Sequence, residues 1–241
     1  MERPNIVDIS FAEEHSDVPE SWKTMSQDKV LILFPSPSNI IISSPTQGGK
    51  TSFVYRLLKH DLFQQTPKNI MYCYNSTWQQ KFDKMQEEID NITFHHGMPS
   101  DGDLEDFQTS SNDHKLLVLD DLMTHASDAD SILKLFTVGT HHNHCTVILL
   151  THNIFVKSKH GRSLSLNTQV FILMANTRDI LQVKTLGRQI DIPKLSDAYS
   201  LATPRPYTYF IIDLHNHTPQ NLRLRSHIFP DDDLTTVYKA Q

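Results

Sequence analysis

Residues 39–53 read NIIISSPTQGGKTSF and carry the signal that decides the fold. The run Ile40-Ile41-Ile42 is apolar and β-branched, which is typical of a strand buried on both faces of a sheet. A turn with two glycines follows, and the chain then continues in the helical pattern SFVYRLLKHDLF. A strand, a glycine turn, Lys-Thr and a helix in this order predict a loop that binds phosphate.

The residue types of this loop suit phosphate binding. Gly48 and Gly49 have no Cβ, so their N–H groups can close on phosphate oxygens. The helix that follows directs the positive end of its dipole at the same anion. Lys50 would reach the β- and γ-phosphates of a nucleotide, and the Thr51 hydroxyl would bind Mg²⁺. The candidate nucleotide-binding residues are Ser44, Pro45, Thr46, Gln47, Gly48, Gly49, Lys50, Thr51 and Ser52.

The loop departs from the pattern G-x-x-x-x-G-K-[ST] at one position, where Ser44 replaces the first glycine. A residue before proline favours extended backbone angles, so Ser44 before Pro45 can leave a strand without being glycine. The alternative interpretation is a strand, turn and helix in which Gly-Gly-Lys occurs by accident. The agreement between the motif and its context favours nucleotide binding.

Residues 115–121 read KLLVLDD, an apolar run that ends in two carboxylates. A buried parallel strand ends at the carboxyl edge of its sheet, where nucleotides bind. There Asp120 would support Mg²⁺, and Asp121 would act as the base or orient the attacking water. Without the loop upstream, a strand that ends in a solvated turn would be the better interpretation.

Composition excludes several classes of protein. The chain has 241 residues, enough for one α/β domain, and its net charge of −6 argues against a surface coated with nucleic-acid-binding charge. Cys73 and Cys145 lie in strand-like runs, which indicates buried thiols in a reducing compartment. No apolar run approaches the roughly 20 residues that span a membrane. The acidic N-terminus does not resemble a signal peptide. We therefore expect an intracellular protein without a membrane partner.

The remaining segments alternate between strand and helix patterns. Residues 1–38 are expected to form an N-terminal arm, which the Pro-rich stretch 34–38 separates from a domain over 39–241. The further predicted strands are 69–74, 92–94, 145–150 and 169–174, and the further helices are 78–89, 101–107, 127–136 and 177–188. In helix 78–89, the spacing of Trp78, Phe82, Met85 and Ile89 predicts a core-facing stripe. The alternation predicts a mainly parallel sheet with helices on both faces, and 207–214 with 222–225 predict a small antiparallel C-terminal addition.

The order and spacing of these segments resemble the HerA/FtsK group of P-loop NTPases. The similarity is greatest to the poxvirus-like genome-packaging ATPases of large DNA viruses and of Maverick (Polinton) elements. The matching segments are SSPTQGGKTSF, YCYNSTWQ, ITFHHGMPS, LLVLDDLM, LFTVGTHH, VILLTHNIF, RSLSLNTQVFIL and the RD of ANTRD, all within residues 34–188.

The resemblance implies ATP and Mg²⁺ as cofactors and an ATPase that works as a homo-oligomeric ring. Such a ring would pull double-stranded DNA into a preformed capsid at a portal-like vertex. The expected location is the host nucleus or a cytoplasmic assembly site, with the virion as a further one.

Two departures from the family pattern bear on hydrolysis. The family places a glutamine after the strand that follows the two carboxylates, where this chain has His152. The family also commonly carries an arginine just before that strand, whereas residues 141–144 read HHNH. Arg162 and Arg178 remain as candidates for an arginine that acts on the neighbouring subunit. The alternatives for these two are a loop charge and an Arg-Asp pair at a helix start.

Two further groups of residues suggest ligands. Lys157, Lys159, His160 and Arg162 form a basic loop that would contact DNA phosphates without reading bases, or that would be an ordinary solvated loop. A second group, His141, His142, His144 and Cys145, suggests zinc, but a structural zinc site needs a second ligand pair at suitable spacing.

Three functions therefore stay open. The first is a DNA-packaging ATPase. The second is a nucleotide-binding assembly protein that hydrolyses ATP poorly. The third is a P-loop kinase for a small substrate, which would need an arginine-bearing lid that the sequence does not clearly contain.

Overall fold

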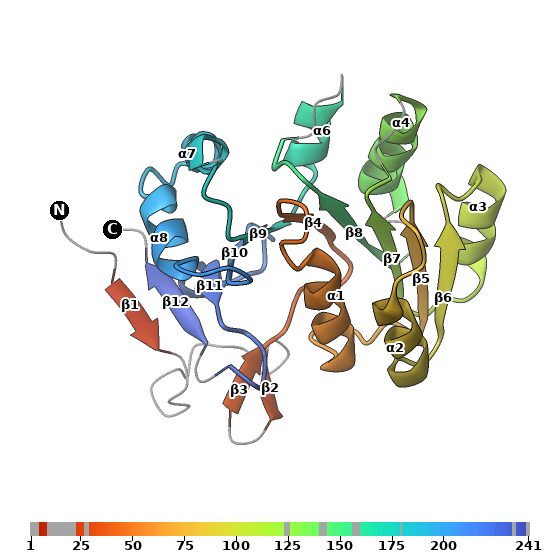
Figure 1. Cartoon of the computed structure of the whole chain (residues 1–241), viewed down its shortest axis with the longest axis horizontal. Helices are drawn as coiled ribbons and strands as arrows, with labels where there is room; N and C mark the ends of the chain where they lie inside the picture. The colour runs from red at the N-terminus through yellow and green to blue at the C-terminus, as the bar shows by residue number, and fades with distance from the viewer. Residues whose placement is uncertain are drawn as a thin grey trace.

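The computed structural model describes residues 5–8, 23–26, 29–122, 126–139, 144–155, 160–178, 180–232 and 235–239. A sheet of ten strands crosses the described part of the chain in the order β1-β12-β11-β10-β9-β4-β8-β7-β5-β6 (Figure 1). The strands of this sheet are β1 (Asn5–Asp8), β4 (Asn39–Ser43), β5 (Asn69–Tyr74), β6 (Ile92–His96), β7 (Lys115–Asp120), β8 (Cys145–Thr151), β9 (Val170–Met174), β10 (Tyr209–Asp213), β11 (Leu224–Ser226) and β12 (Thr236–Lys239). The helices are α1 (Lys50–Lys59), α2 (Gln80–Glu88), α3 (Asp101–Thr109), α4 (Ala126–Lys134), which continues as a π-helical segment (Leu135–Gly139), α6 (Gly161–Leu166), α7 (Ile180–Gln189) and α8 (Leu195–Ala202).

The predicted fold class is confirmed by the strand pairing. Strands β6, β5, β7, β8, β4 and β9 are mutually parallel, and β4 lies between β8 and β9. β10 is antiparallel to β9, and β11 and β12 continue antiparallel beyond it, which is the expected C-terminal addition. The chain is therefore an α/β protein with a mainly parallel sheet.

Helices cover both faces of the sheet, and the alternating side chains of β4 show why this strand is apolar throughout. Ile40 and Ile42 belong to the core under α1 and α2, together with Val54 of α1. Ile41 belongs to the opposite core, under α3, α4, α6, α7 and α8. Figure 1 shows the two helix groups on opposite sides of the parallel strands. A strand covered on both sides has no polar face, as the isoleucine run predicts.

Parallel pairing brings three strand ends to one edge of the sheet. Ser43 at the end of β4 is level with Thr151 at the end of β8, and Asp120 at the end of β7 is level with Leu150. The loops that leave these ends therefore begin next to one another. This edge is where open α/β sheets bind ligands.

Trp78 differs from its predicted place in a core-facing helical stripe. Phe82 and Met85 are buried as expected, but the Trp78 side chain is 44% exposed. α2 begins only at Gln80, after an extended residue, so Trp78 is out of phase with the helix. Its ring instead packs edge-on against Tyr74 and Phe82, and its Nε1 donates to Asp83 (2.7 Å).

Parts of residues 1–38 pack against the rest of the chain. β1 pairs with β12 at the end of the large sheet, and β2 (Lys23–Ser26) pairs with β3 (Lys29–Ile32) in a separate hairpin. Leu31 and Phe34 are buried in the core that contains α1. A domain boundary at residue 38 stays a prediction.

The two cysteines are both buried and free. Burial raises the pKa of the Cys73 thiol and of the Cys145 thiol to about 12, so both are protonated at neutral pH. No helix in the described ranges is both long and apolar enough to cross a membrane.

Candidate nucleotide-binding site

The loop between β4 and α1 follows directly from the sheet. The Ser44 N–H donates to Thr151 O (3.1 Å), which extends the β4–β8 pairing by one residue. Gln47 and Gly49 have positive φ angles of 60° and 98°, and Gly49 is the N-cap of α1. A β-carbon at Gly48 would lie 2.9 Å from the backbone oxygen of Pro45 as well as 1.9 Å from Ser44 Oγ, so the loop would have to shift to accept a side chain there. Both glycines are therefore required, Gly49 by its backbone angles and Gly48 by space.

The N–H groups available for an anion lie at the start of α1. The Gly48 N–H, which the sequence predicted to face phosphate, donates to Pro45 O within the loop in this conformation (3.0 Å). The first helical bond runs from Phe53 N to Gly49 O (2.9 Å), so the N–H groups of residues 50–52 have no partner inside the helix. These groups and the helix dipole form the positive end of the site.

Lys50 is held in the loop by two contacts. Its side chain is only 9% exposed, and its ammonium donates to Ser44 O (3.1 Å) and lies 3.4 Å from Nδ1 of His152. Burial lowers the pKa of Lys50, while the charges of Asp120 and Asp121 act in the opposite direction. Within the described residues no carboxylate pairs directly with this buried cation, which leaves it well placed to receive an anionic ligand.

Asp120 at the end of β7 faces the Thr51 hydroxyl. Its Oδ2 accepts from Tyr72 OH (2.7 Å) and lies 3.5 Å from Thr51 Oγ1. Burial raises the pKa of Asp120, partly offset by the Tyr72 hydrogen bond and the Lys50 charge. A buried carboxylate beside a hydroxyl oxygen fits Mg²⁺, a hard cation that binds through one or two carboxylates and the oxygens of substrate phosphates. Mg²⁺ would therefore be held by Thr51 and Asp120.

Asp121 and His152 form the outer part of the site. Asp121 has a left-handed backbone (φ 56°), and its Oδ1 lies 3.4 Å from Nε2 of His152. His152 Nδ1 also lies 3.2 Å from Ser44 O. The two ring nitrogens therefore face different groups: Nδ1 lies near the Lys50 ammonium and Ser44 O, and Nε2 lies near the Asp121 carboxylate. His152 thereby links the loop lysine to the second carboxylate.

Tyr72 and Lys81 also contact the site, although neither lies in the phosphate-loop motif or in the Asp-Asp motif. Tyr72 lies on β5, next to β7, and its hydroxyl fixes the orientation of the Asp120 carboxylate. Lys81 at the start of α2 donates to Ser52 Oγ (2.9 Å) and adds a positive charge beside the first turn of α1. The pairing of β5 with β7 brings Tyr72 to the site, and the packing of α2 beside α1 brings Lys81 there.

The other predicted residues lie outside this cluster or outside the described residues. Arg162, in the first turn of α6, and Arg178, in the turn before α7, are exposed, and no contact joins either to the phosphate loop in the described part of the chain. Lys157 and Lys159, like His141 and His142, lie outside the described residues. Within the described ranges, no three His, Cys, Asp or Glu side chains gather as a metal site.

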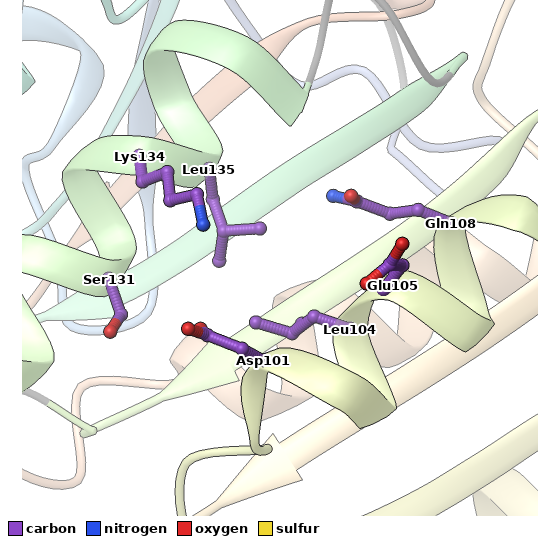
Figure 2. Close-up of a pocket in the computed structure, with 7 residues that line it drawn as sticks. All are labelled: Asp101, Leu104, Glu105, Gln108, Ser131, Lys134 and Leu135. Atoms are coloured by element: carbon purple, nitrogen blue, oxygen red, sulfur yellow. The ribbon is translucent and has the colours of Figure 1, made fainter.

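A cavity between α3 and α4 is separate from the phosphate loop. Figure 2 shows Asp101 and Glu105 of α3 on one side of it and Lys134 of α4 on the other. None of the predicted site residues lines this cavity. It is therefore not part of the candidate nucleotide site.

Comparison with known proteins gives only distant likenesses. No protein-family model and no curated protein sequence matches this chain. One similar solved structure is the genome packaging NTPase B204 of Sulfolobus turreted icosahedral virus 2 in complex with ATP-gammaS, at 13% identity and a TM-score of 0.49, over 85% of this chain and 98% of that chain. Another is the KaiC-like protein PH0186 of Pyrococcus horikoshii OT3, at 15% identity and a TM-score of 0.43, over 86% of this chain and 92% of that chain.

A third similar solved structure is EssC (ATPases 2 and 3) of Geobacillus thermodenitrificans, at 11% identity and a TM-score of 0.41, over 85% of this chain and 37% of that chain. Values this low carry no functional conclusion. We therefore infer the function from the residues of the site.

Proposed function

We propose that this protein binds and hydrolyses Mg²⁺-ATP and uses the energy to move double-stranded DNA into a capsid as a subunit of a homo-oligomeric ring. One observation supports nucleotide binding: a lysine, a hydroxyl, two adjacent carboxylates and an imidazole ring lie close together at one edge of the sheet. These side chains come from three separate segments: Lys50, Thr51, Asp120, Asp121 and His152.

We infer a role in hydrolysis for each residue from its position in the site. Mg²⁺, when bound, would supply positive charge to the phosphate oxygens. Lys50 exchanges its contact with Ser44 O for a phosphate oxygen, and the first N–H groups of α1 donate to the same anion. Asp121 is exposed and not needed for the metal, so it can accept a proton from the attacking water. His152, between Lys50 and Asp121, orients that water.

The DNA part of the proposal is supported by the ordered motifs within residues 34–188. Arg162 and the predicted basic loop with Lys157 and Lys159 would contact the DNA backbone. Since backbone contacts do not read bases, such a loop suits a motor that moves any sequence. The proposed partners are double-stranded DNA, further copies of this chain and a portal-like capsid vertex, in the host nucleus or at a cytoplasmic assembly site.

Steady-state ATPase assays with and without double-stranded DNA test the proposal, with the mass of the particle measured by light scattering. Wild type is expected to form rings with nucleotide and DNA and to turn over ATP faster when DNA is present. Lys50→Ala should stay folded and lose nucleotide binding. Unchanged ATP affinity of a folded Lys50→Ala variant would refute the nucleotide site. Full activity from a monomer, without any response to DNA, would refute the motor.

A second candidate function is a nucleotide-binding assembly protein with little hydrolysis. The observation that favours it is the Nε2 contact between His152 and Asp121, because it engages one oxygen of the carboxylate that the motor needs for water. This candidate predicts tight ATP binding with turnover that DNA does not stimulate.

A further inference from the structure

Tyr207 lies beside the phosphate loop with most of its ring in solvent. Its side chain is 69% exposed, so one face of the ring is open to a ligand. A β-carbon at Gly49 would lie 3.2 Å from Cδ1 of Tyr207 and 3.4 Å from Cε of Met174. One edge of the ring therefore packs against the N-cap of α1, and the rest stays open beside the loop.

The position of this ring depends on a strained backbone conformation at Tyr207. Tyr207 has a φ of 67°, in the left-handed region that bulky residues seldom adopt. The next residue, Thr208, fixes the turn, because its Oγ1 donates to Arg205 O (2.6 Å) and its carbonyl accepts from Ala175 N at the end of β9 (2.9 Å). Strain that surrounding contacts maintain is concentrated at functional sites.

The order of the strands indicates that Tyr207 lies near the nucleoside end of a bound nucleotide and not near its γ-phosphate. Asp120 and Asp121 follow β7, and His152 follows β8, so the hydrolysing groups lie on the β8 side of β4. β9 and β10 lie on the other side, where Tyr209 is paired with Met174. With the γ-phosphate directed towards β8 and β7, the nucleoside must leave the loop towards β9 and β10. Tyr207, two residues before β10, stands in that direction.

We propose that Tyr207 stacks on the base of the bound nucleotide and forms the nucleoside subsite, an inference that rests on the proposed function. Its exposed face offers a flat apolar surface beside Gly49, and the buried Met174 packs behind that glycine. Because every base has a π-face, stacking favours the larger purines without choosing between adenine and guanine. Loss of one such stack corresponds to roughly 5- to 150-fold in affinity.

Calorimetry with two probes, each with Mg²⁺, tests the subsite in the full chain. The probes are a non-hydrolysable ATP analogue and inorganic tripolyphosphate, which has no nucleoside. Tyr207→Ala should weaken the analogue by about tenfold or more and leave tripolyphosphate unchanged. The control Tyr207→Phe keeps the ring and should retain wild-type affinity for both probes. Equal weakening of both probes by Tyr207→Ala, or of neither, would overturn the subsite.

A second measurement tests the nucleoside subsite if Tyr207→Ala fails to fold. Wild type is photolabelled with 8-azido-ATP, whose reactive group is on the base, and the modified peptide is identified by mass spectrometry. Labelling within residues 203–208 is expected, and labelling only elsewhere would overturn the subsite. If wild type binds neither calorimetric probe, the proposed function itself fails, which is a different result from binding both probes without a contribution from Tyr207.

Discussion

Asp120 and Asp121 are adjacent in sequence but differ in environment. Asp120 is buried beside Thr51 and Tyr72, whereas Asp121 projects towards His152 with a 61% exposed side chain. Asp121→Asn is therefore expected to keep Mg²⁺-ATP bound and to reduce turnover by roughly 10²- to 10⁴-fold, because the proton acceptor is lost. Turnover and nucleotide affinity are measured together, with Asp120→Asn as the matched control. That control should weaken the response to Mg²⁺ instead, and an unchanged rate in Asp121→Asn would exclude it as the base.

His152 can be converted to the residue that the resembling family carries. Glutamine offers a carbonyl acceptor and an amide donor on a flexible stem, whereas the imidazole is held between Lys50 and Asp121. We expect His152→Gln to raise ATP turnover by roughly tenfold or more, the size of one well-placed water-orienting group. His152→Asn has the same amide on a shorter side chain and should not reproduce the gain. Identical rates in wild type and His152→Gln would show that His152 does not take part in hydrolysis.

The requirement for glycine in the turn before α1 can be tested by comparison with a second glycine turn in the same chain. Gly49 and Gly97 both have positive φ, of 98° and 85°, but only Gly49 has side chains beside it, since a β-carbon at Gly97 would meet nothing within 4 Å. Alanine at either position should lower the free energy of unfolding by about 1–2 kcal/mol, because both introduce a β-carbon into left-handed backbone. Only Gly49→Ala should also weaken nucleotide binding, since its β-carbon presses on Tyr207. Urea titration and calorimetry check the two effects, and equal loss of affinity in both variants would refute the local explanation.

Elements with a strong local signal could be predicted from the sequence. β4, β5 and β7 lie where their apolar runs place them, because strands covered on both faces contain almost no polar residue. The sequence pattern does not reveal α8, although Leu195, Ala198, Tyr199 and Ala202 are buried at helical spacing. The eight-residue helix is too short for that spacing to stand out. α6 has only six residues and starts at Gly161-Arg162, so it offers no comparable pattern.

Some residues of the candidate site could likewise be predicted from the sequence, and others could not. The phosphate loop and the Asp-Asp pair are continuous motifs, and the structure brings Lys50, Thr51 and Asp120 together as expected. Their roles in catalysis remain predictions. Tyr72, Lys81 and Tyr207 join the site through the packing of distant segments, and nothing in their own neighbourhood of the sequence distinguishes them.

His114 makes the stability of the whole molecule depend on pH. Its Nδ1 donates to Gln65 O (2.6 Å) and its Nε2 accepts from Thr146 Oγ1 (2.9 Å), while Thr146 Oγ1 also accepts from Ser38 N (3.2 Å). Burial lowers the pKa of His114 to about 4, from 6.5 in the unfolded chain. The unfolded state therefore takes up the proton first, so this contribution is fully present above pH 6.5 and is lost as the pH falls towards 4. At pH 5 the loss should be about 2 kcal/mol relative to neutral pH.

Urea titrations at pH 7.5 and pH 5 measure this effect. His114→Gln removes the ionisable group, so its free energy of unfolding should change less between the two pH values than that of wild type, by about 2 kcal/mol. The exposed His217 provides the control, because His217→Gln should keep the wild-type dependence. An unchanged pH dependence in His114→Gln would show that another group is responsible.

The burial of both native cysteines has a practical consequence for spectroscopy. Thiolates, not thiols, react with maleimides, and neither Cys73 nor Cys145 is ionised at neutral pH in the folded chain. A single cysteine introduced on the surface, for example at Leu166, would take up a fluorophore with little background from the native pair. The native thiols would react only when β5 or the start of β8 opens, so their rate of modification would time the opening of the sheet.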